Sequence, residues 1–357
     1  MIRKLYFLLL SFFILIQNSQ AQTGADSLFN FISQNRAKSA VYLVQNDSVL
    51  AMLNPNKRMP LASTVKLLVA VEFAKQSAAG VISESTPVAL DDLEKYHFPL
   101  TDGGAHAQWL IYEKEMGHIQ NDSIALLHVA QGMMWFSSNA NTEYIMDLLG
   151  LDNVKNNLQL LGMHEHTPIY YLVSSLFMYQ NPKKKKETAI LKGIKRLNEE
   201  QYARYIYDMH NALKYDTVLK AKFNPADLSA NMQKLWSERL PSSNVKTYAK
   251  LCNILNNRKY FTAEAYASFA RVVEFALMAN PANQKMFKHA GMKGGSTAWV
   301  LTKALYATTQ EGDRIELCYF FNDLTPKEQA SLESWMNDFE LRVLTDENFR
   351  TQFAKKL

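Results

Sequence analysis

The 357-residue chain has few cysteines, little net charge and no long hydrophobic run beyond its first residues. Its two cysteines, Cys252 and Cys318, lie in separate apolar segments and form no metal-ligand pattern. In an exported protein they could form a disulfide or remain as two buried thiols. The net charge of +5 is modest and does not indicate nucleic acid as a partner. No later segment is long and apolar enough to cross a bilayer.

The first 21 residues have the pattern of a secretory signal peptide. Arg3 and Lys4 precede an uncharged apolar run over residues 5–16, and small residues stand at the −3 and −1 positions of a cut after Ala21. The run has about a dozen residues, fewer than the ~20 that a spanning helix needs. We therefore expect a periplasmic protein, exported without a stable membrane anchor after cleavage, with a net charge of +3.

Hydrophobic periodicity divides the rest of the chain, residues 22–357, into two lobes of one domain. The first and last thirds each contain strands, and the middle is helical. We expect these strands to pair into one antiparallel sheet flanked by the terminal helices, with the helical middle as a second lobe. The expected divisions are an α/β lobe at 22–62 and 245–357, a helical lobe at 63–244, and within it an insertion at about 180–240. Residues 181–186 include four consecutive lysines, and we expect a solvated loop there.

Ser63 and Lys66 stand at the start of an apolar helical run, three residues apart. On a helix this spacing places both side chains on one face. A serine hydroxyl needs a base before it becomes a good nucleophile, and a lysine can be that base when desolvation lowers its pKa. The helix N-terminus adds N–H groups that favour an oxyanion. Taken alone, the pair favours a capping serine and a surface lysine, because short motifs often occur by chance.

Two further motifs follow this pair along the chain. Ser137-Ser138-Asn139 and Lys293-Gly294-Gly295-Ser296 come after Ser63-Thr64-Val65-Lys66 in the order of the S-x-x-K, S-D-N and K-T-G motifs. The chain therefore resembles the serine β-lactamase and penicillin-binding protein superfamily, and class A β-lactamases most closely, over residues 28–162 and 245–335. The resemblance implies a β-lactamase/transpeptidase-like α/β (α+β) fold, with a five-stranded antiparallel sheet, a helical lobe and an active site between them.

The resemblance also implies a role for each matching residue. Ser63 would be the acylated nucleophile, Lys66 its base, and Ser137 the relay that carries a proton to the leaving nitrogen. Asn139 would bind the substrate amide, and Lys293 would supply positive charge near the substrate carboxylate. The remaining substrate-binding positions would be Gly295, Ser296, Thr297 and Trp109. The backbone N–H groups of the nucleophile and of residue 296 would form the oxyanion hole. No metal or cofactor is implied.

Some positions depart from the family pattern or have two interpretations. Ser138 replaces the acidic residue of S-D-N, a position that usually supports the loop. Gly294 replaces the hydroxyl residue of K-T-G, so Ser296 or Thr297 must take over any contact with a carboxylate. Trp109 either walls the cleft or packs in the core, and Lys303 either binds a carboxylate or faces solvent.

The glutamate that activates water for deacylation in class A enzymes has no equivalent at the expected place. It should follow Gly162 by about ten residues, but residues 170–175 contain no carboxylate, and Glu165 and His166 come too early. We expect a monomeric serine hydrolase in which a β-lactam or a related amide or ester acylates Ser63. We expect the resulting acyl-enzyme to be hydrolysed slowly. The alternatives are a penicillin-recognising D,D-peptidase or esterase for peptidoglycan-like peptides, and a non-catalytic binding module.

Overall fold

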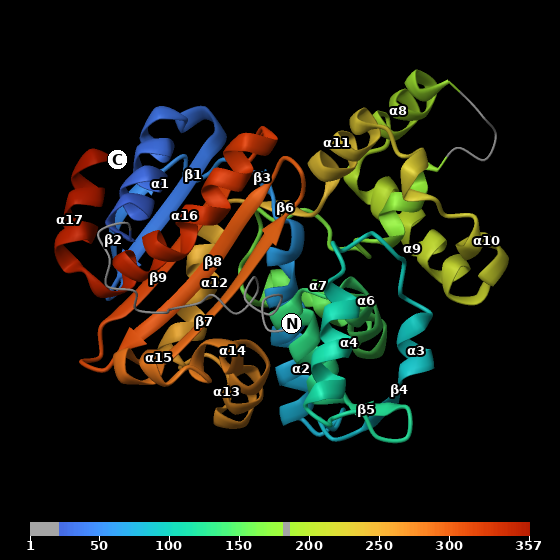
Figure 1. Ribbon diagram of the computed structural model, residues 1–357, viewed down its shortest axis with the longest axis horizontal. Coiled ribbons are helices and arrows are strands. Elements are labelled where there is room, and N and C mark those ends of the chain that lie inside the picture. The colour runs from blue at the N-terminus through green and yellow to red at the C-terminus, as the bar shows by residue number, and fades with distance from the viewer. Residues whose placement is uncertain (1–20, 181–185) are drawn as a thin grey trace, which may run out of the picture. The chain divides into compact units, whose positions relative to one another are not determined.

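The computed structural model describes residues 21–180 and 186–357 (Figure 1). Except for the last residue of each, the predicted signal peptide and lysine-rich loop lie outside this part. The chain folds into two compact units, which divide it at the junctions 64/65, 242/243, 260/261 and 273/274. The second unit contains residues 65–242 and 261–273, and the rest belongs to the first. This division differs from the expected lobes mainly at residues 261–273, which join the helical unit.

The first unit is built on a five-stranded sheet with the order β2-β1-β9-β8-β7, in which every neighbouring pair is antiparallel. Its strands are β1 (Ser39–Gln45), β2 (Ser48–Leu53), β7 (Phe287–Ser296), β8 (Leu301–Thr309) and β9 (Arg314–Phe321). The strands from the two ends of the chain meet where β1 pairs with β9. The predicted fold class and sheet are confirmed. Two-residue strands occur at β3 (Met59–Pro60) and β6 (Ser242–Ser243).

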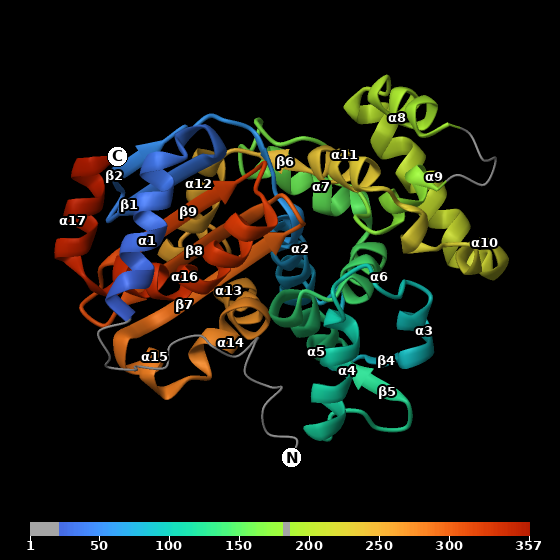
Figure 2. The ribbon, with the colours of Figure 1, turned by 45° about the horizontal axis from the view of Figure 1, so that its top comes forward.

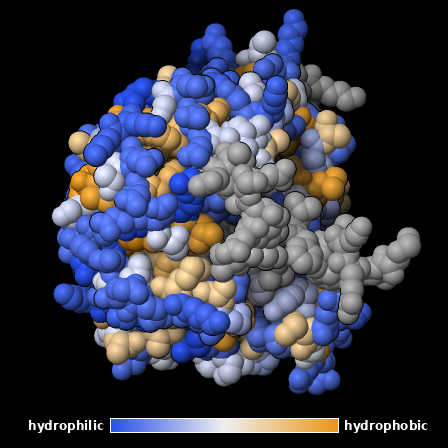
Figure 3. Space-filling model, turned by 60° about the vertical axis from the view of Figure 1, so that its left-hand side comes forward, coloured by the Kyte–Doolittle hydropathy of each residue, from blue (hydrophilic) through white to orange (hydrophobic). Residues whose placement is uncertain are grey.

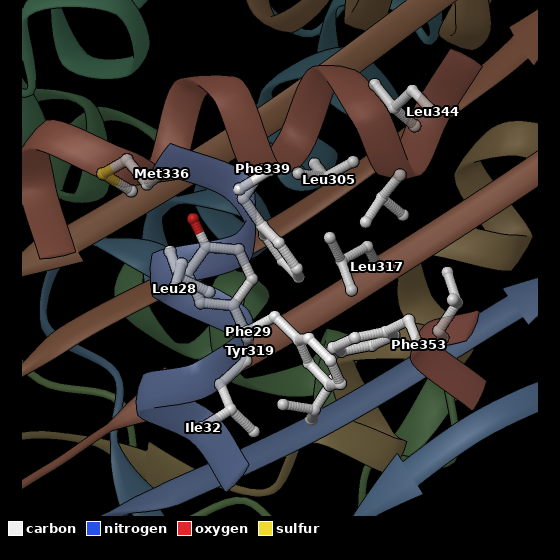
Figure 4. Close-up of a cluster of buried hydrophobic side chains, with 14 of the residues drawn as sticks. Leu28, Phe29, Ile32, Leu305, Leu317, Tyr319, Met336, Phe339, Leu344 and Phe353 are labelled. Carbon is white, nitrogen blue, oxygen red and sulfur yellow. The ribbon is translucent and has the colours of Figure 1, made fainter. Parts of the chain in front are cut away.

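Helices cover both faces of this sheet (Figures 1 and 2). One face carries α1 (Ala21–Gln34), α16 (Pro326–Thr345) and α17 (Glu347–Lys356), and the other carries α12 (Val245–Asn257). Successive side chains of β9 point to opposite faces of the sheet, as strand geometry requires. Leu317 and Tyr319 join the hydrophobic cluster under α1 and α16, which Figure 4 shows converging on the sheet. Phe320 instead contacts Tyr248 of α12.

Burial of this cluster is what holds the first unit together. Its members include Leu28 of α1, Phe339 of α16 and Phe353 of α17, each at most 1% exposed (Figure 4). Each such side chain contributes roughly 1.5–3 kcal/mol when it leaves water. The two cysteines lie on the other face. Both are free and buried, and their sulfur atoms are 3.9 Å apart.

The start of α16 has a reciprocal capping arrangement, a capping box. Thr325 is its N-cap and Pro326 its first residue. The Glu328 backbone N–H donates to Thr325 Oγ1 at 3.3 Å, and the Thr325 N–H donates to Glu328 Oε2 at 2.7 Å. This reciprocal pair satisfies two N–H groups that the helix leaves without partners. Two short helices, α14 (Phe275–Met278) and α15 (Pro281–Met286), precede β7.

The second unit is helical around α2 (Lys66–Ala78), whose residues are buried almost throughout. The segment 123–136 does not form one continuous α-helix. It begins as strand β5 (Ser123–Ala125), paired with β4 (Pro87–Ala89), and ends as a π-helical turn at Gly132–Phe136. The other helices are α3 (Leu90–Glu94), α4 (Ala105–Glu115), α5 (Leu126–Gln131), α6 (Asn139–Leu149), α7 (Leu151–Leu160) and α13 (Ala263–Phe269).

The expected insertion is helical. Its helices are α8 (Glu187–Lys195), α9 (Glu199–Tyr215), α10 (Thr217–Ala221) and α11 (Ala230–Arg239). None of the helices in the described part of the chain has both the length and the apolar character needed to cross a membrane. The face in Figure 3 is mainly hydrophilic, with hydrophobic residues in small groups between polar ones.

Candidate active site

Ser63 lies in a short 3-10 helix, Ala62–Val65, and α2 follows it directly at Lys66. Val65 has helical backbone angles, so the helical path from Ser63 to Lys66 is unbroken. Ala62 has a φ of +46°, in the left-handed region that few residues other than glycine adopt. Such strain persists only where the surroundings enforce it. The turn that carries Ser63 is therefore held from outside.

Gly295 and Thr302 hold this turn within the first unit. A Cβ atom on Gly295 would lie 2.5 Å from both the Leu61 oxygen and the Ser63 nitrogen, so only glycine fits there. Thr302 pairs with Gly295 across β7 and β8. Its Oγ1 lies 2.8 Å from the Leu61 oxygen and 2.8 Å from Thr64 Oγ1. The sequence analysis missed Thr302, because a lone threonine gains this position only from the sheet register.

Lys293 lies on β7, an edge strand of the sheet. It is 5% exposed, and its Nζ donates to the Gly294 carbonyl oxygen at 2.9 Å. Ser296 ends the strand and is exposed. Thr297 Oγ1 accepts a hydrogen bond from the Trp299 backbone N–H at 3.2 Å.

Lys303 takes neither of its two predicted roles. It is 5% exposed, and its Nζ lies 3.4 Å from Glu340 Oε1 and 3.7 Å from Met292 Sδ. Burial raises the pKa of Glu340, and Lys303 works against that shift. Because α16 supplies Glu340, this lysine is neither solvent-facing nor open to a substrate carboxylate.

Lys66 is fully buried at the start of α2, in contact with the second motif. Its Nζ donates to the Ser137 carbonyl oxygen at 2.7 Å and to Asn139 Oδ1 at 2.9 Å, and lies 3.2 Å from Ser137 Oγ. Burial lowers the pKa of Lys66 to about 7, although the charges of Asp102 and Glu143 oppose this. A lysine with such a pKa can take up or release a proton near neutral pH, as a general base must.

The second motif is presented by unusual backbone geometry. A π-helical turn at Gly132–Phe136 ends at Ser137, whose φ is +66°. A Cβ atom on Gly132 would lie 2.3 Å from Asn141 Nδ2, so the turn also needs glycine. Ser138 caps α6, since its Oγ accepts from the Asn141 N–H at 3.2 Å. Its Oγ also lies 2.9 Å from His106 Nδ1. Ser138 thus supports the loop.

Trp109 is fully buried in α4, and its indole N–H donates to Glu113 Oε1 at 3.0 Å. Its ring also packs beside His106, with centroids 5.3 Å apart. The structure therefore favours the core-packing interpretation of Trp109 over a wall of the cleft.

Two carboxylates near Lys66 were missed. Asp102 accepts hydrogen bonds from the backbone N–H groups of Gly104 and His106, both at 3.1 Å. Glu143 follows Asn139 by four residues and so shares its face of α6. That spacing was a signal that could have found it.

Glu143 holds the segment where class A enzymes would have their glutamate. Its Oε1 accepts from the Val173 N–H at 2.7 Å and the Ser174 N–H at 3.1 Å. Its Oε2 accepts from Ser174 Oγ at 2.9 Å and lies 3.2 Å from His210 Nδ1. Glu143 is 1% exposed, and both its oxygens are occupied.

His210 shows what the insertion contributes here. It lies on α9, and its Nε2 is 3.1 Å from Asp147 Oδ1. Its ring stacks on Tyr171 with centroids 3.4 Å apart. Burial acts to lower the pKa of His210, but Asp147 and Glu143 outweigh it and raise the pKa to about 9. The insertion thus places a cation between two carboxylates of α6.

Each unit therefore brings together part of the predicted residue set. In the first unit, the backbone of Ser63 lies against Gly295, on the strand that carries Lys293. In the second, Lys66 contacts both Ser137 and Asn139.

Solved structures of similar fold include β-lactamases. A class A β-lactamase representative from Bacteroides cellulosilyticus aligns with 13% identity and a TM-score of 0.53, covering 92% of this chain and all of that one. A β-lactamase from Chitinophaga pinensis aligns with 15% identity and a TM-score of 0.54, covering 90% and 97%. The protein PBP-A aligns with 15% identity and a TM-score of 0.51, covering 88% and 95%. At such identities the likeness shows a common fold.

A family match identifies the relationship more directly than these structures do. Residues 25–276, well over half of the chain, match the pattern of the beta-lactamase enzyme family. This stretch contains the first two motifs, including the buried Lys66, and it supports a hydrolase of the serine β-lactamase type. The chain belongs to the beta-lactamase enzyme family.

Proposed function

We propose that this protein is an exported active-site-serine hydrolase that acylates Ser63 with a β-lactam or a related amide or ester, and that clears the acyl group slowly. The observation that carries the proposal is Lys66, a fully buried lysine with a pKa near neutrality that contacts Ser137 and Asn139. A structural lysine has no need of that environment, whereas a general base does.

In the proposed reaction, Lys66 takes the proton of Ser63 Oγ, directly or through a water molecule. Oγ then bonds to the carbonyl carbon of the substrate, and the C–N bond (or C–O bond of an ester) breaks. Ser137 hands a proton to the leaving atom. The oxyanion accepts hydrogen bonds from the backbone N–H groups of residues 63 and 296. Asn139 binds the substrate amide, and Lys293 binds the substrate carboxylate.

Slow deacylation is proposed because the two carboxylates whose charges act on Lys66, Asp102 and Glu143, already accept hydrogen bonds from other groups. The segment 170–175 contains no carboxylate. Glu143 has its charge near Lys66, but its oxygens already accept from Val173 and Ser174 and contact His210. A carboxylate so engaged binds the loop and is a poor general base, because its lone pairs are in use.

The same observation keeps a second function open. An enzyme that acylates well and deacylates badly on β-lactams is a penicillin-recognising D,D-peptidase or esterase, whose own substrate would be a peptidoglycan-like peptide. We also propose export to the periplasm, which rests on the signal-peptide pattern of residues 1–21.

One experiment separates these functions. The purified protein is incubated with a chromogenic cephalosporin while colour and intact mass are followed, with Ser63→Ala as the control. We expect a stoichiometric adduct that forms quickly, decays slowly and is absent in Ser63→Ala. Rapid turnover would overturn the slow step, and a peptide substrate cleaved faster than the cephalosporin would favour the peptidase. If neither an adduct nor turnover is observed, the remaining interpretation is a non-catalytic binding module.

A further inference from the structure

Two clusters of histidine and glutamate lie in the helical unit, on either side of Trp109. Helix α4 presents His106, Trp109 and Glu113 at intervals of three and four residues, which places all three on one buried face. One cluster contains Glu94, His97 and His106, and the other contains Glu113, His118 and His128. In each, one carboxylate oxygen and two ring nitrogens lie within 4.8 Å of one another.

The first cluster has separations that suit one tetrahedral ion. His97 Nδ1 lies 3.2 Å from Glu94 Oε2, and His106 Nε2 lies 3.7 Å from Glu94 Oε1. Zinc–ligand bonds of about 2.0–2.1 Å at tetrahedral angles place ligand atoms about 3.4 Å apart. The two observed separations bracket this value, each to a different oxygen of Glu94, so the carboxylate lies between the two imidazoles. The carboxylate is also available, because Lys220 donates to the backbone oxygen of Glu94 and not to its side chain.

His106 is already oriented as a ligand would be. Its side chain is 1% exposed, and Nδ1 is engaged by Ser138 Oγ at 2.9 Å, so Nε2 is the nitrogen that faces Glu94. Metal-binding histidines are commonly fixed in this way through their second nitrogen. By contrast, 24% of the His97 side chain and 53% of the Glu94 side chain are exposed. The cluster therefore combines one rigid ligand with two that an ion can reach from solvent.

The second cluster is a poorer match. His118 Nδ1 and His128 Nδ1 both face the same oxygen of Glu113, at 2.6 and 3.6 Å. The first separation is that of a short hydrogen bond, well below the ligand spacing of zinc. The two rings stack at 4.0 Å with only 21° between their planes, so their in-plane lone pairs run side by side and do not converge. This cluster is explained as a hydrogen-bonded carboxylate with two imidazoles.

We propose that Glu94, His97 and His106 form a binding site for a divalent transition-metal ion of the zinc class, with the fourth position open to water. The nitrogen and oxygen donors suit zinc, cobalt or nickel better than calcium or magnesium, which prefer oxygen ligands alone. The sequence analysis implied no metal and did not single out these three residues. The site would join Ser138 through His106, and so would border the loop that contacts Lys66.

The test is metal binding by the untagged, chelator-treated protein, since a polyhistidine tag would bind these ions itself. Zinc chloride is titrated calorimetrically, and cobalt chloride is titrated while its visible absorption is recorded, because histidine ligation changes that spectrum. His97→Ala and Glu94→Gln remove accessible ligands and leave the buried His106 in place. His118→Ala is the matched control, since it removes a histidine from the other cluster.

We expect saturable binding at micromolar zinc, weakened by about 100-fold or more in His97→Ala, clearly weakened in Glu94→Gln and unchanged in His118→Ala. Thermal melts of each variant without metal check that it folds. Any other pattern overturns the proposal, including no saturable binding by the natural protein or equal binding by His97→Ala. The readouts do not depend on acylation of Ser63, so the outcome stands apart from that of the proposed function.

Discussion

Replacing Gly295 by alanine tests how the nucleophile turn is held. The added Cβ would lie 2.5 Å from the Leu61 oxygen, 2.5 Å from the Ser63 nitrogen and 2.8 Å from the Thr64 nitrogen. All three are backbone atoms, so no side chain can rotate out of the way. Either β7 or the turn must move by nearly 1 Å to restore ordinary contact distances.

The size of the effect follows from that displacement. Overpacking of a filled site costs about 1–3 kcal/mol of unfolding free energy. Misplacement of a reacting group by about 1 Å can cost about 100-fold in rate. Gly294→Ala is the matched control, because its Cβ would meet Lys303 Cε and the Thr302 oxygen at 3.4 Å, an ordinary contact. Gly295→Ala should therefore acylate about 100-fold more slowly and unfold more easily, while Gly294→Ala stays close to the natural protein.

The assay is the rate of labelling by a fluorescent penicillin, followed by gel, together with urea unfolding of both variants. If Gly295→Ala labels and unfolds like the natural protein, the close approach of β7 to the turn is not what positions Ser63. If both substitutions slow labelling and destabilise the protein equally, then any added side chain on this part of β7 is harmful, and the close contact at Gly295 is not the specific cause. The unfolding measurement remains informative even if the protein forms no acyl-enzyme.

Three further predictions concern buried groups. The acylation rate should rise with pH through about 7, the pKa to which burial lowers Lys66, because only the neutral amine accepts a proton; Lys66→Met should abolish acylation, and a pH-independent rate would contradict this. The His210 pKa is raised from 6.5 to about 9, so its stabilising contribution is complete below pH 6.5, is lost as the pH rises through 9, and amounts to roughly 3 kcal/mol at most. Urea unfolding at pH 6.5 and 9 should show that loss in the natural protein and in the exposed-site control His164→Gln but not in His210→Gln, and identical pH slopes in all three would refute it. Thiol titration of the unreduced, unfolded protein should detect both Cys252 and Cys318, whose sulfurs are 3.9 Å apart; finding no thiol would show a disulfide.

The local features of this protein could be predicted because they depend on neighbours in the sequence. The spacing of Ser63 and Lys66 places them one helical turn apart whatever the rest of the chain does. Thr325, Pro326 and Glu328 define a helix start through contacts within four residues. Short apolar segments in the first and last thirds of the chain similarly indicated strands there before any pairing was known.

Tertiary structure decided the features that depend on contacts between distant segments. Thr302 reaches the Leu61 carbonyl across 241 residues because of how β7 and β8 align. Lys303 is buried because α16 brings Glu340 to it, which no property of its own segment reveals.

The environment of Lys66 belongs to the same class. The sequence by itself determined that a serine and a lysine share the start of a helix, since helical spacing is a local property of the chain. Whether that lysine is a solvated cation or a base near neutrality was decided only by folding. Desolvation and the contacts with Ser137 and Asn139 come from segments more than 70 residues away. A pKa is set by the groups and solvent around a side chain, and these exist only once the chain has packed.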